Sequence, residues 1–186
     1  MDINNKTNRF VIKKLISKSD IEKRIVIIAK EINKYYLNIN ETILILGVLK
    51  SSIIFFSTLL TKLNINCQID FLYISSFDGK LVSQNKPIWR MKPNFELKGR
   101  KILVIEDIVD SGNTINLIID YLTENQVDSF KIATFLIKKT EKKIKDTPEI
   151  NWYGFKIEDL FVVGYGLDYE EKLRNLPYVG KLVLLN

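Results

Sequence analysis

The sequence contains no histidine, and this absence excludes much of the usual catalytic chemistry. Without imidazole there is no Ser-His-Asp triad and no histidine proton shuttle, and most transition-metal sites lose their preferred ligand. The single cysteine, Cys67, cannot form a disulfide or a thiolate zinc site within the chain, and its apolar surroundings predict a small core residue. Any catalysis must therefore rest on carboxylates, lysines, hydroxyls and backbone amides, with or without a hard metal ion.

Long hydrophobic runs are missing as well. No apolar stretch is long enough to span a membrane, and the polar segment Met1–Arg9 lacks the apolar core of a signal peptide. We therefore expect a cytoplasmic protein that does not bind a membrane. A chain of 186 residues, 46% of them hydrophobic, suits a single compact domain over residues 1–186.

The net charge of +6 is compatible with nucleic acid or with anionic metabolites as partners. The densest basic stretch, Lys138–Lys145, contains Glu141 and has no aromatic residues between its lysines. This composition is more typical of a solvated loop than of a nucleic-acid-binding stripe. We therefore expect no nucleic-acid partner.

Two kinds of periodicity alternate along the chain. Helical spacing predicts helices over residues 20–37, 52–63 and 113–125, the first with Ser19 or Asp20 as its N-cap. Short continuous apolar runs predict buried strands over residues 42–48, 67–74, 101–106, 131–137, 161–164 and 181–185. Buried strands separated by helices predict an α/β fold with a mostly parallel central sheet and helices on both faces.

Function is expected where the predicted strands end. Ligands of parallel sheets bind beyond the carboxyl ends of the strands, which here are the segments after residues 48, 74, 106 and 137. Residues 75–100 contain two prolines and little periodicity, and a loop of that length predicts a mobile lid or a binding loop.

The segment Val104–Thr114 is the richest in chemistry. It begins in a predicted buried strand, continues with three acids, and passes through a small polar loop into a predicted helix. The residues Ser111, Gly112, Asn113 and Thr114 place backbone N–H groups and two hydroxyls at the start of that helix, which suits a phosphate. Gly112 allows close approach of the backbone because it has no Cβ atom.

The acids before this loop point to a sugar and a metal ion. Glu106 and Asp107 would repel each other unless they shared a ligand, and a sugar diol with Mg²⁺ supplies both donors and positive charge. Asp110 directly precedes the polar loop and would face whatever is attached to the phosphate. An ordinary strand-to-helix turn explains Ser111 and Asp110 as helix caps, but it does not explain Glu106 and Asp107. The segment lacks the Gly-Lys-[Ser/Thr] of a P-loop and the GxGxxG of a dinucleotide site.

The run VIEDIVDSGNT over residues 104–114 closely resembles the phosphoribosyl-pyrophosphate motif of type I phosphoribosyltransferases. The flanking pattern is similar to that of the hypoxanthine (hypoxanthine-guanine) members of this family. It comprises GVLKSS at 47–52, Ser75-Ser76-Phe77, FLIKKT at 135–140 and FVVGYGLDYEEKLRNLPYVG at 161–180. The resemblance runs from about residue 10 to the C-terminus.

The resemblance implies both a fold and a reaction. The fold is the type I phosphoribosyltransferase fold, in which the N- and C-terminal segments form a small hood. The reaction is purine salvage, the transfer of the phosphoribosyl group of 5-phosphoribosyl-1-pyrophosphate to hypoxanthine, and also to guanine, to form IMP or GMP and pyrophosphate. The implied cofactor is Mg²⁺, and the implied assembly is a homodimer or homotetramer.

The resemblance also implies a role for each matched residue. Glu106 and Asp107 would hold the ribose hydroxyls and the metal environment, and Asp110 would act as general base at the purine N7. Ser111, Gly112, Asn113 and Thr114 would bind the 5′-phosphate. The base would be bound by Lys138 at its 6-oxo group, by stacking on Phe161 and by the backbone of Val162. The pyrophosphate would be bound by Leu49, Lys50, Ser51 and Arg174, with a Mg²⁺ ion on Asp168, and the lid would include Ser75, Ser76 and Phe77.

Taken without the resemblance, four of these residues have simpler interpretations. Lys138 follows an apolar strand and could extend its amine to solvent. Phe161 at a strand start is more often a core residue, and Asp168 with Arg174 could form a surface ion pair.

The chain departs from the family pattern at two places. Phe77 stands where a tyrosine is usual, and the stretch after it lacks the expected Ser/Thr-rich signature. Ser51-Ser52 replaces a Gly-Ser or Gly-Gly pair, so a glycine-like backbone at Ser51 would cost energy.

Two alternatives remain open from the sequence. One is a phosphoribosyltransferase for another base, such as xanthine or a pyrimidine, which Lys138 and Phe161 disfavour. The other is an RNA-binding regulator on the same fold, which the positive charge permits. That alternative is disfavoured because Asp110, Lys138, Asp168 and Arg174 are all present.

Overall fold

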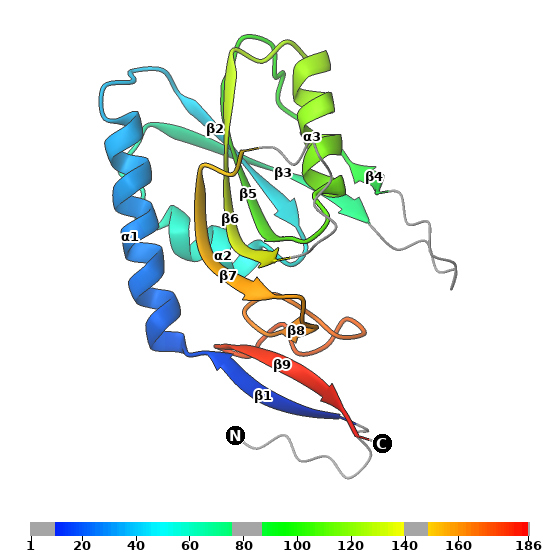
Figure 1. The fold of residues 1–186 in the computed structure, drawn as a ribbon. Coiled ribbons are helices and arrows are strands. Elements are labelled where there is room, and N and C mark those ends of the chain that lie inside the picture. The colour runs from blue at the N-terminus through cyan, green and yellow to red at the C-terminus, as the bar shows by residue number, and fades with distance from the viewer. Residues whose placement is uncertain (1–9, 76–86, 140–148, 186) are drawn as a thin grey trace.

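The computed structural model describes residues 10–75, 87–139 and 149–185, and its centre is a six-stranded sheet with the order β4-β3-β2-β5-β6-β7 (Figure 1). All neighbouring strands of this sheet run parallel except the pair β3 and β4. The strands are β2 (Ile43–Leu49), β3 (Cys67–Ser75), β4 (Ile88–Met91), β5 (Lys101–Val109), β6 (Ser129–Lys139) and β7 (Trp152–Glu158).

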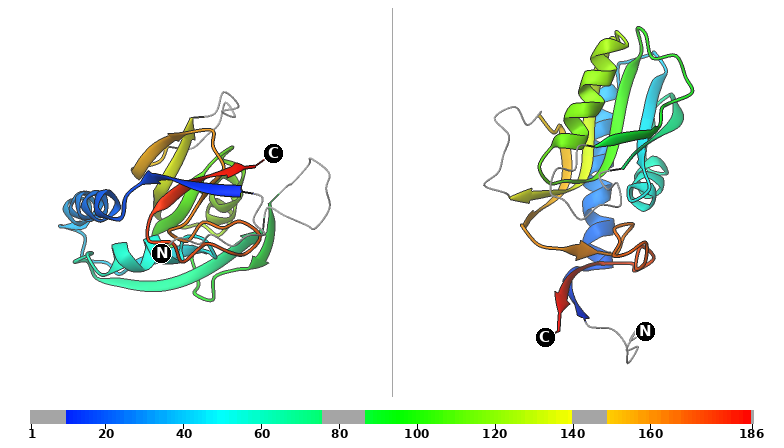
Figure 2. Two further views of the ribbon diagram at one scale, coloured as in Figure 1. Left: turned by 90° about the horizontal axis from the view of Figure 1, so that it is seen from below. Right: turned by 90° about the vertical axis from the view of Figure 1, so that its right-hand side faces the viewer.

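Helices cover both faces of this sheet, as Figure 2 shows from two further directions. They are α1 (Lys18–Tyr36), α2 (Ile53–Leu60) and α3 (Asn113–Glu124). In strand β5 the run Ile102–Ile105 is continuously apolar, and the packing on its two sides explains this. Leu103 and Ile105 pack into the core under α1 and α2, whereas Ile102 and Val104 pack into the core under α3. Successive side chains of a strand point to opposite faces, and here both faces are covered. The predicted α/β architecture is confirmed.

A second, antiparallel sheet joins the N- and C-terminal segments at one end of the molecule (Figure 1). It contains β1 (Phe10–Ile16), β9 (Val179–Leu184) and β8 (Val162–Val163), in the order β1-β9-β8. The carboxyl ends of the parallel strands point toward this sheet. The small sheet is therefore the hood that the family resemblance implied.

Several expectations from the sequence need correction. Strands β1, β4 and β7 were not predicted, and β4 interrupts the loop expected over residues 75–100. The turn after β4 is held to β3 because the carboxylate of Asp70 accepts hydrogen bonds from the backbone N–H groups of Asn94 and Phe95. The prediction of a continuous loop is therefore wrong for residues 88–91, and residues 76–86 lie outside the described residues.

The N-cap of the first helix was also predicted at the wrong residue. The cap is Ser17, whose hydroxyl oxygen accepts a hydrogen bond from the backbone N–H of Asp20 at 3.2 Å. Ser19 and Asp20 therefore lie in the first turn, where an acidic side chain is still favourable beside the helix N-terminus.

The basic stretch at 138–145 is not a loop at its beginning, because Lys138 and Lys139 end strand β6. The remainder of that stretch lies outside the described residues. Among the helices of the described part of the chain, none combines the length and the hydropathy needed to cross a membrane.

Candidate functional site

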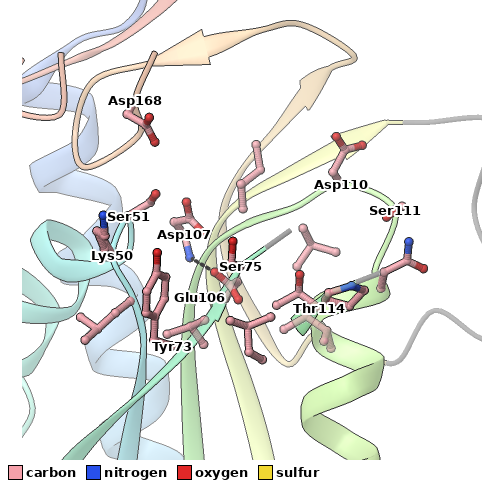
Figure 3. Close-up of a pocket in the computed structure, with 18 of the residues that line it drawn as sticks. Lys50, Ser51, Tyr73, Ser75, Glu106, Asp107, Asp110, Ser111, Thr114 and Asp168 are labelled. Atoms are coloured by element: carbon pink, nitrogen blue, oxygen red, sulfur yellow. Dashed lines mark hydrogen bonds between the residues drawn. The ribbon is translucent and has the colours of Figure 1, made fainter. Parts of the chain in front are cut away.

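A pocket of about 480 Å³ lies where strands β2, β3 and β5 end and helix α3 begins. Figure 3 shows Lys50 and Ser51 on one side of it, Asp110 and Ser111 on the other, and Glu106 and Asp107 between them. The segment after β8 completes the wall with Asp168, Glu171 and Arg174. The pocket thus occupies the carboxyl edge of the sheet, as the sequence predicted.

Glu106 forms the buried floor of this pocket and is only 4% exposed. Its Oε1 atom accepts a hydrogen bond from the backbone N–H of Asp107 at 3.0 Å, whereas Oε2 has no partner among the described residues. Burial and the neighbouring carboxylate of Asp107 together raise the pKa of Glu106 well above its ordinary value. A buried carboxyl oxygen without a partner is costly, so this atom is an open position for a hydroxyl of a ligand.

The loop between β5 and α3 is shaped by Gly112. This residue is the N-cap of α3 and has φ +86°, in the left-handed region that favours glycine. A glycine offers no side chain to the N–H groups of the first helical turn, which also lack acceptors within the helix. Ser111 and Thr114 line the pocket at the same end. The arrangement can therefore bind a phosphate through backbone N–H groups and hydroxyls.

Beside one side of the pocket, a lysine outside its wall lies between two acids. The Nζ atom of Lys138, at the end of β6, lies 2.9 Å from Asp110 Oδ2 and 3.2 Å from Asp159 Oδ1. The side chain of Lys138 is only 14% exposed, so its amine does not extend to bulk solvent. Burial alone would lower the pKa of Lys138, but the hydrogen bonds and charges of the two acids outweigh it and raise the pKa above its ordinary value. The lysine therefore stays an ammonium beside Asp110.

The opposite side of the pocket is organised by Arg174. Its Nη1 atom donates to Ser51 Oγ at 2.7 Å and to the carbonyl oxygen of Gly166 at 2.9 Å. Its Nη2 atom lies 2.8 Å from Asp168 Oδ1 and 3.0 Å from Glu171 Oε2. The guanidinium therefore joins the loop after β2 to the segment after β8.

Lys50 belongs to the same network, because its Nζ atom lies 3.2 Å from Glu171 Oε2. The peptide bond that precedes it, between Leu49 and Lys50, is cis. Ser51 is not among the residues with positive φ, so the glycine-like backbone considered from the sequence does not occur there. A glycine is required instead at Gly166, where the backbone packs against the loop that contains Ser51. It has φ +99°, and a Cβ atom on it would lie 2.0 Å from the carbonyl oxygen of Ser51.

The family model of the phosphoribosyl transferase domain matches residues 15–170, which is most of the chain. The chain belongs to the phosphoribosyltransferase family. Relatives and solved structures agree with this assignment. The chain is 34% identical over 173 residues to the hypoxanthine phosphoribosyltransferase of Salmonella typhimurium, an alignment that covers 92% of this chain and 96% of that protein.

Two solved structures are similar to this phosphoribosyltransferase over nearly their whole length. The hypoxanthine phosphoribosyltransferase of Staphylococcus aureus has a TM-score of 0.84 and 32% identity, covering 98% of this chain and 97% of that one. The hypoxanthine-guanine phosphoribosyltransferase of Bacillus anthracis has a TM-score of 0.82 and 30% identity, covering 94% of this chain and 99% of that one. These similarities extend to both sheets.

Most of the site residues expected from the sequence of this phosphoribosyltransferase line one pocket. They are Leu49, Lys50, Ser51, Ser75, Glu106, Asp107, Asp110, Ser111, Gly112, Asn113, Thr114, Asp168 and Arg174. Glu106 and Asp107 lie within β5 rather than beyond it, because that strand continues to Val109. Ser76 and Phe77 lie outside the described residues.

Three expected residues lie outside the pocket wall. Lys138 is joined to it through Asp110, and Val162 is buried in the short strand β8. Phe161 is 54% exposed, and its ring packs edge-on against Tyr169 with a centroid separation of 5.8 Å. Its exposure contradicts the interpretation of Phe161 as a core residue.

Sequence reasoning missed two acids that contact the cations of this site. Asp159 contacts Lys138, and Glu171 contacts both Lys50 and Arg174. Asp168, Glu171 and Arg174 recur at intervals of three residues, and this spacing could have indicated one cluster. Asp159 has no comparable signal, since its partner comes from a strand 21 residues away.

Proposed function

We propose that the protein transfers the phosphoribosyl group of 5-phosphoribosyl-1-pyrophosphate to hypoxanthine, and also to guanine, forming IMP or GMP and pyrophosphate in purine salvage. The observation that carries this proposal is the Asp110–Lys138 pair, a carboxylate and an ammonium 2.9 Å apart beside a pocket suited to a sugar phosphate. A purine with a 6-oxo group needs both a proton acceptor and a proton donor at neighbouring positions. The similar proteins named above for hypoxanthine support this choice of base.

The sugar phosphate would bind along the loop between β5 and α3. Ser111, Gly112, Asn113 and Thr114 would hold the 5′-phosphate through backbone N–H groups and hydroxyls at the start of the helix. The ribose hydroxyls would contact Glu106 and Asp107, whose carboxyl groups lie beside this loop. The unpartnered Oε2 atom of Glu106 supports this placement, because a ribose hydroxyl would satisfy it.

The charge of the pocket supports Mg²⁺ as the cofactor. Among the described residues, five acids line it, namely Glu106, Asp107, Asp110, Asp168 and Glu171, against the two cations Lys50 and Arg174. Bound alone, a pyrophosphate would meet an excess of carboxylates, and a divalent cation relieves that repulsion. Mg²⁺ usually takes one or two carboxylates and completes its shell with phosphate oxygens and water. We therefore propose Asp168 for one ion and Glu106 with Asp107 for the metal environment of the ribose.

The reaction breaks the bond between the anomeric carbon and pyrophosphate, whose oxygen leaves with the electron pair, and joins that carbon to the purine nitrogen. Positive charge develops on the sugar, and the neighbouring carboxylate of Asp107 favours it. Bound Mg²⁺ would neutralise part of the negative charge on the leaving group. Lys50, Arg174 and the backbone of Leu49 and Ser51 would bind the departing pyrophosphate.

The base would be positioned by Lys138, Phe161 and Val162. The Lys138 ammonium would donate to the 6-oxo group, the ring of Phe161 would stack on the purine, and the backbone of Val162 would contact its other edge. Asp110 would accept the proton from N7, a contribution typically of about 10²–10⁴-fold in rate.

We also propose a homodimer or homotetramer in solution, which light scattering would test. Binding of nucleic acid is not expected of this enzyme.

The decisive experiment supplies the protein with 5-phosphoribosyl-1-pyrophosphate, Mg²⁺ and one base at a time, and follows nucleotide formation. Hypoxanthine and guanine should give IMP and GMP, whereas adenine should give little product. Turnover of xanthine or uracil alone would favour the alternative of a phosphoribosyltransferase for another base. If no base gave a nucleotide, the proposed function would be wrong.

A further inference from the structure

Asp159 is an acid beside the proposed base site that the reaction above does not use. It lies in the connection from β7 to β8, two residues before Phe161, and its Oδ1 atom is 3.2 Å from the Nζ atom of Lys138. Asp159 does not line the pocket, whereas Asp110, the other acid on Lys138, does. One ammonium is therefore held by two carboxylates that face different surroundings.

The two acids cannot contribute equally during the proposed reaction. When Asp110 accepts the N7 proton it becomes neutral, and its attraction for the Lys138 ammonium falls. A largely buried lysine with no remaining charged partner would no longer be fixed in position. Asp159 is not among the residues that line the pocket, so it does not accept the N7 proton in the proposed reaction and remains a second partner of Lys138.

We propose that Asp159 is a positioning residue for base recognition. It fixes the Lys138 ammonium at the 6-oxo group of the purine independently of Asp110. It also links Lys138 to the segment that leads into β8, where Phe161 and Val162 lie. The three proposed base-binding residues are thereby held in fixed positions relative to one another. This inference rests on the proposed function.

The neighbouring residues supply a matched control. Strands β6 and β7 pair with Lys138 opposite Ile157 and Lys139 opposite Glu158. Glu158 forms its own ion pair with Lys139, at 2.8 Å between Oε1 and Nζ, and both of those side chains are exposed. Since successive strand residues point to opposite faces, this pair lies away from Lys138. The variant Glu158→Gln thus removes an adjacent acid and an adjacent ion pair without removing the acid on Lys138.

The first test compares steady-state kinetics of Asp159→Asn, Asp159→Glu, Glu158→Gln and the wild type. In Asp159→Asn the KM for hypoxanthine should rise about 3- to 10-fold, as expected for loss of one partly exposed charged hydrogen bond. Its KM for 5-phosphoribosyl-1-pyrophosphate should stay within about twofold, because Asp159 is outside the sugar-phosphate pocket. Asp159→Glu should recover most of the hypoxanthine KM, and Glu158→Gln should match the wild type.

The second test is a double-mutant cycle with Lys138→Gln. If Asp159 acts through Lys138, adding Asp159→Asn to Lys138→Gln should not change the hypoxanthine KM further. Additive effects, or an equal rise in both KM values, would overturn the inference, since they would show a general structural role. An unchanged hypoxanthine KM in Asp159→Asn would also overturn it. By contrast, a wild-type protein that makes no IMP would refute the proposed function itself.

Discussion

The two ends of the pocket hold their charged groups in different ways. At the proposed base end one ammonium, Lys138, is shared by the two acids Asp110 and Asp159. At the proposed pyrophosphate end the two cations Lys50 and Arg174 share the carboxylate of Glu171, and Arg174 also pairs with Asp168. The first end thus places two acids on one cation, whereas the second places two acids on two cations.

This difference predicts which contacts of the protein persist and which exchange when each ligand binds. A neutral purine can enter the base end while Lys138 keeps a carboxylate partner, so those contacts can persist. A pyrophosphate group bound there as proposed would compete with Glu171 for the same two cations, so contacts at the other end would exchange. Substitutions at the two ends should therefore separate effects on the chemical step from effects on the binding of phosphate groups.

The largest expected effect is that of Asp110→Asn at the base end. The amide cannot accept the N7 proton, so kcat should fall by about 10²–10⁴-fold. The affinity for 5-phosphoribosyl-1-pyrophosphate should change little, because the phosphate loop and Arg174 are untouched. Initial rates and equilibrium binding of that substrate would measure the two quantities. Asp120→Asn, an exposed acid on α3, is the control for loss of charge, and normal turnover of Asp110→Asn would refute the assignment.

A smaller effect is expected for Arg174→Ala at the pyrophosphate end. The variant loses the guanidinium that contacts Ser51, Gly166, Asp168 and Glu171. Removing charged hydrogen bonds costs about 1.5–3 kcal/mol, so the binding of pyrophosphate should weaken about 10- to 150-fold.

Product inhibition by pyrophosphate, measured against 5-phosphoribosyl-1-pyrophosphate, would give this value. Lys172→Ala removes a positive charge from an exposed position of the same segment and should leave the inhibition constant nearly unchanged. If both variants weakened inhibition equally, the effect would come from net charge and not from the contacts of Arg174.

The sequence predicted the central sheet because its inner strands are covered on both faces. Strand β2 and the Ile102–Ile105 part of β5 are continuously apolar for that reason, and short apolar runs identify such strands. The missed strands lack this signal. Strand β7 alternates buried and exposed residues and includes a glycine, while β1 contains two lysines among its apolar residues. Strand β1 is also fixed by pairing with β9 at the other end of the chain, and local periodicity carries no information on that pairing.

The candidate site was predictable to the extent that its residues are adjacent in sequence. Glu106, Asp107 and Asp110 belong to one strand and the loop after it, so the sequence predicted that they contribute to one site. Asp159 and Glu171 contact the ammonium groups of Lys138 and Lys50, which come from distant segments of the chain. Only the folded structure shows those contacts. Likewise, the buried state of Glu106 follows from the continuation of β5 to Val109, which the apolar run alone did not indicate.

Glu106 lies between the two ends of the pocket, and its expected effect is on the stability of the protein without ligand or metal. Burial raises the pKa of Glu106 in the folded chain well above 4.5, its ordinary value, which the unfolded chain retains. Below pH 4.5 both states carry the proton, so this group makes no difference between them. As the pH rises above that value the unfolded chain releases the proton and is favoured, until the pH passes the pKa of the folded state.

The variant Glu106→Gln does not titrate at this position, so its free energy of unfolding should exceed that of the wild type by an amount that grows with pH. The growth should be at most about 1.4 kcal/mol for each pH unit. Urea unfolding at pH 5, 6 and 7 without Mg²⁺ would measure it, with Glu124→Gln as a control in which an exposed acid is replaced. A constant difference across this range would mean that Glu106 is already ionised in the free protein. An ionised Glu106 would then add negative charge to the floor of the pocket and could attract Mg²⁺ before any substrate binds.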